Sequence, residues 1–94
     1  NNLTTARTYY RDALRLYEHL DHTEGIAQTR AGLGRWLISQ DYLQEGIAEL
    51  QQAQALFHAA NQPQRAAALD ELIQECQRIL AKLTHPSETV KEAL

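Results

Sequence analysis

Apolar residues recur along this chain at spacings of three and four, and the pattern stops at regular points. The breaks fall at Asp21, Asp41 and Asn61, which lie twenty residues apart. Spacings of three and four are typical of amphipathic helices, because they gather apolar side chains on one face. The pattern therefore predicts four long helices that end near residues 20, 39, 60 and 83, with a short fifth helix over 87–94.

Each break has the form of a helix N-terminal cap. The tetrads Asp21-x-x-Glu24, Asp41-x-x-Gln44 and Asn61-x-x-Gln64 resemble the capping box, in which two side chains satisfy free backbone N–H groups. Caps so close to the preceding helix leave only short turns, and short turns make neighbouring helices antiparallel. Because the chain is rich in Ala and Leu and has a single Val, we expect an all-α fold.

A unit of forty residues is repeated within the chain. The matched positions are apolar or small: Leu3, Leu43 and Leu83; Ala13, Ala53 and Ala93; Leu16 and Leu56; Tyr17 and Phe57; Ala6 and Gly46; Leu33 and Ile73. Repetition of a helix pair is typical of a solenoid, in which each unit packs on the next. The alternative is an ordinary antiparallel bundle, in which Ala and Leu give some of these matches by chance.

The middle of the chain resembles the tetratricopeptide repeat family. The residues that carry the resemblance are Leu33-Gly34, Leu37, Gly46-Ile47, Ala53 and Leu56. The period of forty resembles the long-repeat variety found in bacterial regulators and signalling proteins. The resemblance implies one domain, 1–94, in which 1–20 is the second helix of a truncated repeat, 21–60 is a complete repeat and 61–94 is a C-terminal repeat or capping helix. The sequence departs from the family pattern at Arg30, Asp41 and His58.

The resemblance also implies a function, the non-catalytic binding of a protein partner by one module of a larger protein. In that family the first helix of each pair lines the inner curve, where a peptide or helix binds. The corresponding groove residues here are Gln28, Arg35, Ser39, Glu71, Glu75 and Arg78. The alternative interpretation is a solvated face held by pairs within one helix, such as those among Glu71, Glu75 and Arg78.

A second hypothesis is a structural segment that associates with itself. The first predicted helix has apolar residues over a wide arc, wider than one neighbouring helix can cover. The residues expected at a contact between copies are Leu3, Tyr10, Leu14 and Tyr17. We therefore expect a homo-oligomer when the chain is isolated. A ligand cage of Tyr9, Tyr10, Tyr17 and Trp36 is a further alternative to packing between helices.

Composition and spacing argue against other classes of protein. The net charge is −3 and there is no basic stripe, so nucleic acid is not an expected partner. The sequence has no run of eighteen apolar residues, so no membrane span is expected. His19-x-x-His22 offers two imidazoles where a metal site needs three or four ligands, and no catalytic or cofactor motif is found. The lone Cys76 is expected in the core, excludes an internal disulfide and suits the reducing cytoplasm.

Overall fold

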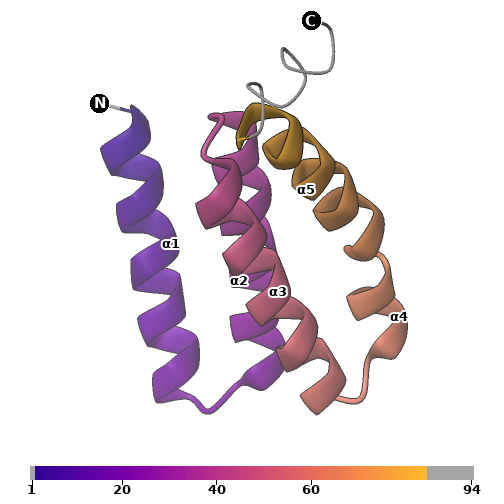
Figure 1. The fold of residues 1–94 in the computed structure, drawn as a ribbon. Helices are drawn as coiled ribbons and strands as arrows, with labels where there is room; N and C mark the ends of the chain where they lie inside the picture. Colours follow the sequence, from indigo (N-terminus) through magenta and orange to yellow (C-terminus); the bar gives the residue numbers. More distant parts are fainter. Residues whose placement is uncertain (1, 85–94) are drawn as a thin grey trace, which may run out of the picture.

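The computed structural model describes residues 2–84, which form helices joined by turns (Figure 1). The helices are α1 (Asn2–His19), α2 (Thr23–Ser39), α3 (Leu43–Ala59), α4 (Pro63–Ala67) and α5 (Asp70–Thr84). The all-α prediction is confirmed, and the predicted helix ends at 20, 39, 60 and 83 each lie within one residue of those observed. The fifth helix predicted over 87–94 lies outside the described residues.

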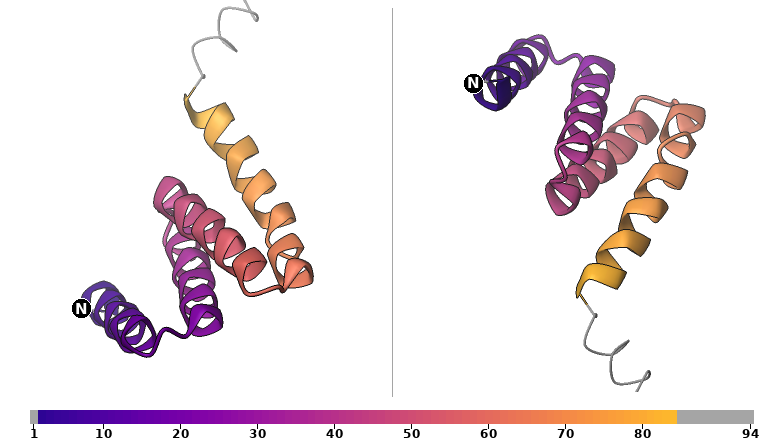
Figure 2. Two further views of the ribbon diagram at one scale, coloured as in Figure 1. Left: turned by 90° about the horizontal axis from the view of Figure 1, so that it is seen from below. Right: turned by 90° about the horizontal axis from the view of Figure 1, so that it is seen from above.

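Helices α1, α2 and α3 run in alternating directions, and the α4–α5 segment runs back along α3 (Figure 1). The most extensive contact joins α2 to α3, while α1 packs on α2, and α4 and α5 pack on α3. In views along the helices, α1 and α5 lie on opposite sides of the α2–α3 pair (Figure 2). A closed four-helix bundle would bring the first and last helices together. The described helices therefore form an open row, with α2 and α3 at its centre.

The three breaks at twenty-residue intervals have one backbone geometry. Asp21, Asp41 and Asn61 adopt left-handed conformations, with φ of 52°, 67° and 60°. At the first break, the Asp21 N–H donates to the Glu18 carbonyl and the His22 N–H donates to the Tyr17 carbonyl. The other two breaks have the equivalent pairs of hydrogen bonds. This is the Schellman motif, which satisfies free carbonyls at a helix C-terminus.

The capping-box prediction is therefore wrong for these positions. The residues that precede α2, α3 and α4 are His22, Tyr42 and Gln62, one residue later than predicted. Only His22 makes a side-chain cap, because its Nδ1 accepts a hydrogen bond from the Gly25 N–H at 2.8 Å. Asp and Asn serve at both helix N-caps and left-handed positions, so the residue type alone did not distinguish the two roles.

The predicted fourth helix is interrupted at residues 68–69. In a continuous helix the Ala66 carbonyl would accept the N–H of Asp70. Here the Ala66 carbonyl accepts the Leu69 N–H at 3.2 Å and the Gln54 side-chain amide at 2.9 Å, and the same amide lies 2.5 Å from Oδ1 of Asp70. Gln54 belongs to α3, so a tertiary contact sets the break and local sequence did not reveal it. Leu69, in the turn, is 2% exposed.

The core lies along both sides of α3. Its buried residues are Ala27, Ala31, Ile47, Leu50, Ala53, Phe57, Ala66, Leu69, Ile73 and Cys76. The predicted apolar face of the fourth helix is confirmed as far as Cys76. The spacing of three and four also predicts Ile79 and Leu83 on that face, but they are 39% and 65% exposed. Leu83 borders an open recess with Tyr42 and Leu43 at the start of α3.

The α2–α3 contact depends on two glycines that face each other. A Cβ atom added to Gly34 would lie 2.9 Å from the Gly46 carbonyl oxygen and 2.8 Å from Leu50 side-chain carbons. A Cβ atom added to Gly46 would lie 2.9 Å from the Gly34 carbonyl oxygen. Because backbone atoms cannot move aside as a side chain can, both positions require the absence of a side chain.

We expect Gly34→Ala to lower the free energy of unfolding by about 1–3 kcal/mol, because the added methyl separates α2 from α3. The matched control is Gly32→Ala in the same helix, where the Cβ atom meets only the Tyr10 ring edge at 3.3 Å. Because alanine has a higher helix propensity than glycine, the free energy of unfolding of Gly32→Ala should stay within about 1 kcal/mol of wild type. Urea unfolding measures both variants, and equal stabilities would contradict the close approach at Gly34.

We expect Asp41→Gly to raise the free energy of unfolding by about 0.5–1 kcal/mol, because glycine adopts positive φ without the cost an L side chain meets. The matched control is the preceding residue, Gln40, whose φ of −98° suits any L residue. Gln40→Gly should lower stability, since there glycine only adds entropy to the unfolded chain. Thermal unfolding of the two variants should shift the Tm in opposite directions.

Candidate interaction surfaces

A groove lies between α2 and the α4–α5 segment, and we call it the α2–α4 groove. Its volume is about 240 Å³, and it is lined by Gln28, Ala31, Arg35, Phe57, Arg65, Ala68 and Leu69. Two of the predicted groove residues, Gln28 and Arg35, lie here. Phe57 and Leu69 are 4% and 2% exposed and form an apolar floor, while Arg35 and Arg65 are exposed cations on opposite walls. The groove can therefore hold an apolar side chain together with a negative charge.

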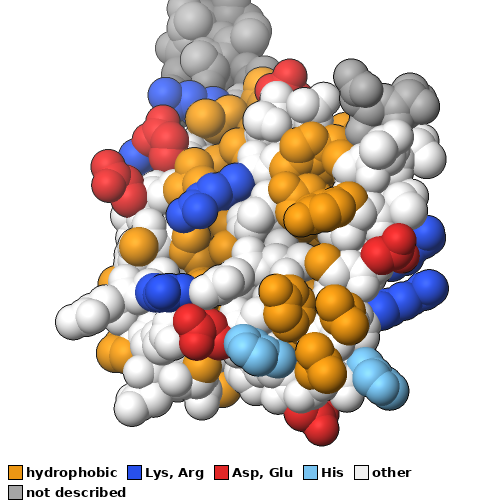
Figure 3. Space-filling view, turned by 180° about the vertical axis from the view of Figure 1, so that it is seen from behind, with side chains coloured by type: hydrophobic (Ala, Val, Ile, Leu, Met, Phe, Trp, Pro, Cys, Tyr) orange, Lys and Arg blue, Asp and Glu red, His pale blue; other side chains and the backbone are white. Residues whose placement is uncertain are grey.

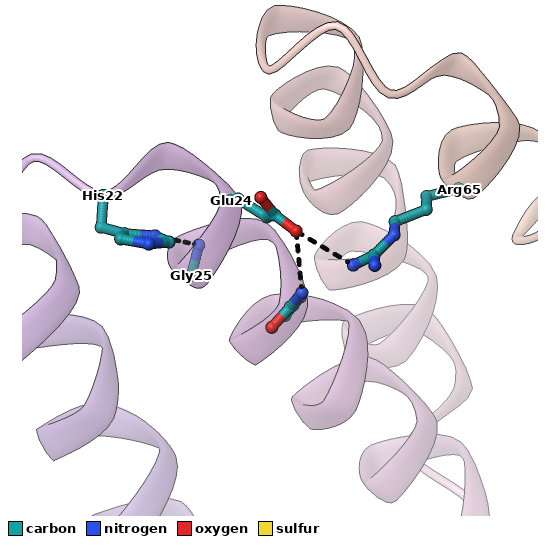
Figure 4. Close-up of polar contacts among 5 residues, drawn as sticks. His22, Glu24, Gly25 and Arg65 are labelled. Carbon is teal, nitrogen blue, oxygen red and sulfur yellow. Dashed lines mark hydrogen bonds and ion pairs between the residues drawn. The ribbon is translucent and has the colours of Figure 1, made fainter.

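A polar cluster lies beside this groove and includes two of its lining residues, Gln28 and Arg65 (Figure 4). Glu24 Oε1 accepts a hydrogen bond from the Gln28 side chain at 3.2 Å and lies 3.3 Å from the Arg65 guanidinium. Behind it, His22 caps the first turn of α2 through Gly25. Glu24 and Arg65 were not among the predicted site residues. They lie 41 positions apart, and no spacing within a single helix relates them.

Two of the remaining predicted residues continue the groove, and the other two do not line it. Glu71 and Glu75 line an adjoining recess of about 420 Å³ that shares Ala68 with the α2–α4 groove. Arg78 donates a hydrogen bond to Glu75 within α5, which lowers the pKa of that carboxyl and raises the pKa of Arg78. This is the pair within one helix that the alternative interpretation requires. Ser39 is exposed and donates to the Trp36 carbonyl at 2.6 Å.

A larger groove lies between α1 and α2, and we call it the α1–α2 groove. It has a volume of about 620 Å³ and is lined by Tyr9, Tyr10, Asp12, Ala13, Leu16, Tyr17, Gln28 and Thr29. Gln28 lines both grooves, so α2 is the ridge between them. Viewed from the side of α1 and α2, hydrophobic side chains gather in groups over these two helices (Figure 3).

The tyrosines predicted for self-association pack largely on α2. Tyr17 lies over Gly25, where an added Cβ atom would overlap its ring at 2.3 Å, and Tyr10 lies over Gly32 and 6.3 Å from the Trp36 ring. Tyr10 and Tyr17 therefore make the packing between helices that was the alternative to a ligand cage. Leu3 and Leu14 are also half-buried, and Leu14 lines a recess with Leu33 on α2.

The most exposed large apolar residues of α1 are different ones. Tyr9, Leu16 and Leu20 are 69%, 56% and 59% exposed. They lie on the face of α1 next to the one that carries Tyr10 and Tyr17. The sequence did not distinguish the exposed face from the packed face, because the apolar residues of both faces repeat at helical spacing. The match of Leu16 with Leu56 was the available signal, since it marks Leu16 as a packing position.

The residues considered for metal or thiol chemistry do not form a site in the described part of the chain. His22 is the α2 cap, and His19 ends α1. Within residues 2–84, no group of three or more His, Cys, Asp or Glu side chains is placed to hold a metal ion. Cys76 is 2% exposed, as predicted, and its burial, with a smaller contribution from the Glu75 charge, raises the pKa of the thiol. In the same described range, no helix is long and apolar enough to cross a membrane.

Comparisons with protein-family models, with curated proteins and with solved structures found no match to this chain. A functional assignment therefore depends on the chemistry of the two grooves.

We expect Cys76 to react slowly with a thiol reagent in the folded chain and quickly in urea. Burial keeps the reagent out, and a raised pKa lowers the fraction of reactive thiolate. Folding raises the pKa of the Cys76 thiol, so the protonated thiol stabilises the folded chain. This stabilisation is fully present below the thiol pKa of the unfolded chain and is lost as the pH rises through the pKa of the folded chain. Labelling followed by mass spectrometry measures the rates, and rapid stoichiometric labelling of folded protein would place Cys76 outside the core.

Proposed function

We propose that this chain is a non-catalytic helical-repeat module, similar to a tetratricopeptide repeat, that binds an acidic peptide segment in the α2–α4 groove. The observation that carries the proposal is the position of Arg35, an exposed cation beside an apolar floor. Among residues 2–84, Arg35 has no ion-pair partner, as is also true of Arg11 and Arg15 on α1, whereas Arg7, Arg30, Arg65 and Arg78 each pair with a glutamate. A guanidinium in this position can bind a carboxylate in two-point geometry.

Apolar and charged features of the groove favour a peptide over a small charged molecule. Phe57 and Leu69 offer an apolar contact at the bottom of the groove, which suits a side chain next to the acidic group. Glu71 and Glu75 line the adjoining recess, so a ligand that continues past Ala68 meets the opposite charge. This arrangement fits an extended or helical segment that carries an acidic residue and a basic residue close together. The single, buried cysteine fits a module that works in the cytoplasm.

The test begins with a display library of random peptides about a dozen residues long, selected on the whole chain. We expect the enriched peptides to contain Asp or Glu. Binding of a fluorescent synthetic version should weaken about tenfold or more in Arg35→Glu, which corresponds to ~1.4 kcal/mol or more. The reason is that the variant places a negative charge opposite the ligand carboxylate.

The matched control is Arg11→Glu, which makes the same change of charge on α1, outside the α2–α4 groove. It should leave the affinity close to that of wild type. An equal loss in both variants would mean that the net charge of the chain, and not this groove, attracts the peptide. Enrichment of basic peptides, or of none, would contradict the proposal directly.

A further inference from the structure

The exposed side of α1 has a regular seam of apolar residues, which we call the α1 seam. It consists of Ala6, Tyr9, Ala13, Leu16 and Leu20, at alternating spacings of three and four. Tyr9, Leu16 and Leu20 are each more than half exposed, and the two alanines are partly buried. This spacing keeps the five residues on one face over most of the length of α1, which is the pattern of a helix-packing surface.

The internal repeat indicates what kind of element such a face receives. A shift of forty residues places Ala6 on Gly46 and Tyr9 on Glu49 of α3. Both of those positions contact α2: Gly46 meets Gly34 and Ile38, and Glu49 pairs with Arg30 at 2.9 Å. The face of α3 equivalent to the α1 seam is therefore covered by a helix, whereas on α1 it borders the open α1–α2 groove.

We propose that a second copy of this chain covers the α1 seam, with the two α1 helices packed antiparallel about a twofold axis. In an antiparallel pair centred between Leu14 and Arg15, each large side chain of the seam faces a different partner. Tyr9 faces Leu20 of the other copy, and Ala13 faces Leu16 of the other copy. Small residues thus oppose large ones in the middle, which gives the interdigitated packing that helix pairs require.

Polar residues beside the α1 seam are complementary in the same alignment. Asp12 and His19 lie one heptad apart on one flank of the seam, at positions that meet each other's counterparts in an antiparallel pair. Asp12 therefore approaches His19 of the other copy, twice by symmetry, and an imidazole N–H can donate to a carboxylate. In a parallel pair the flank that carries Asp12 and His19 would instead face the opposite flank of the other helix, so the two residues would not meet. The charge pattern selects the antiparallel orientation, and it also favours a second copy over an unrelated helix.

The contact is a single helix pair, and an interface of this size belongs to the weak class. We therefore expect a reversible dimer that dissociates within the micromolar range. This proposal is independent of peptide binding in the α2–α4 groove, because α1 contributes no residue to that groove.

Sedimentation equilibrium of the whole chain across the micromolar range tests the proposal. We expect the wild type to dimerise and Leu16→Glu to weaken the dimer by about tenfold or more, because it places a charge at the centre of the contact. The matched control is Leu83→Glu on α5, which changes a leucine of similar exposure, 65% against 56%, outside the seam. A monomeric wild type, or equal effects of the two variants, would overturn the proposal and leave the seam to a different helix.

A charge exchange tests the antiparallel orientation and does not remove apolar area. Asp12→Lys and His19→Glu should each weaken the dimer, since each places like or unmatched groups together. The double variant, Asp12→Lys with His19→Glu, should restore the association, because Lys then faces Glu at both symmetric positions. Circular dichroism of each variant checks that the helices remain folded. Failure of the double variant to recover would contradict the antiparallel pairing.

Discussion

The close approach of α2 and α3 at Gly34 and Gly46 is the contact on which the other helices depend. With no side chain on either residue, backbone lies against backbone, and each glycine's missing Cβ position is within 2.9 Å of the other's carbonyl oxygen. This separation brings Leu50 and Ala53 into full burial. The helices α1 and α5 pack on opposite sides of this pair, so the pair positions the helices that line both grooves.

The positions of the helices could be predicted from the sequence because each helix is long and strongly periodic. The interruption of the last one could not. The Ala66 carbonyl accepts a hydrogen bond from Gln54, a residue of another helix. Helix propensity depends only on residues 63–70 themselves, so it could not predict this hydrogen bond. The turns illustrate a different failure. Asp21, Asp41 and Asn61 were recognised as special positions, but their side chains suit either end of a helix, and backbone hydrogen bonds decide which.

The candidate site shows the same division between local and tertiary information. Gln28 and Arg35 follow from a stripe at helical spacing, and the structure places both in one groove. Arg65 and Glu24 meet across two helices, and their approach depends on how α4 packs against α3. On α1 the helical period was recognised but its phase was not. Tyr9 and Tyr10 are adjacent in sequence and point about 100° apart, so one is largely exposed and the other packs on Trp36.

The pair formed by Glu24 and Arg65 has a consequence for any ligand of the α2–α4 groove. Glu24 already pairs with Arg65, one of the two cations of the groove, so the chain itself provides a carboxylate that competes with an acidic ligand there. An incoming acidic group must either bind Arg35 alone or displace Glu24 from Arg65. Because both partners of the pair are partly exposed, dissolved salt weakens their attraction and the attraction of a ligand together. The selectivity of the groove between ligands with one and with two acidic groups therefore depends on how firmly Glu24 is held by Gln28.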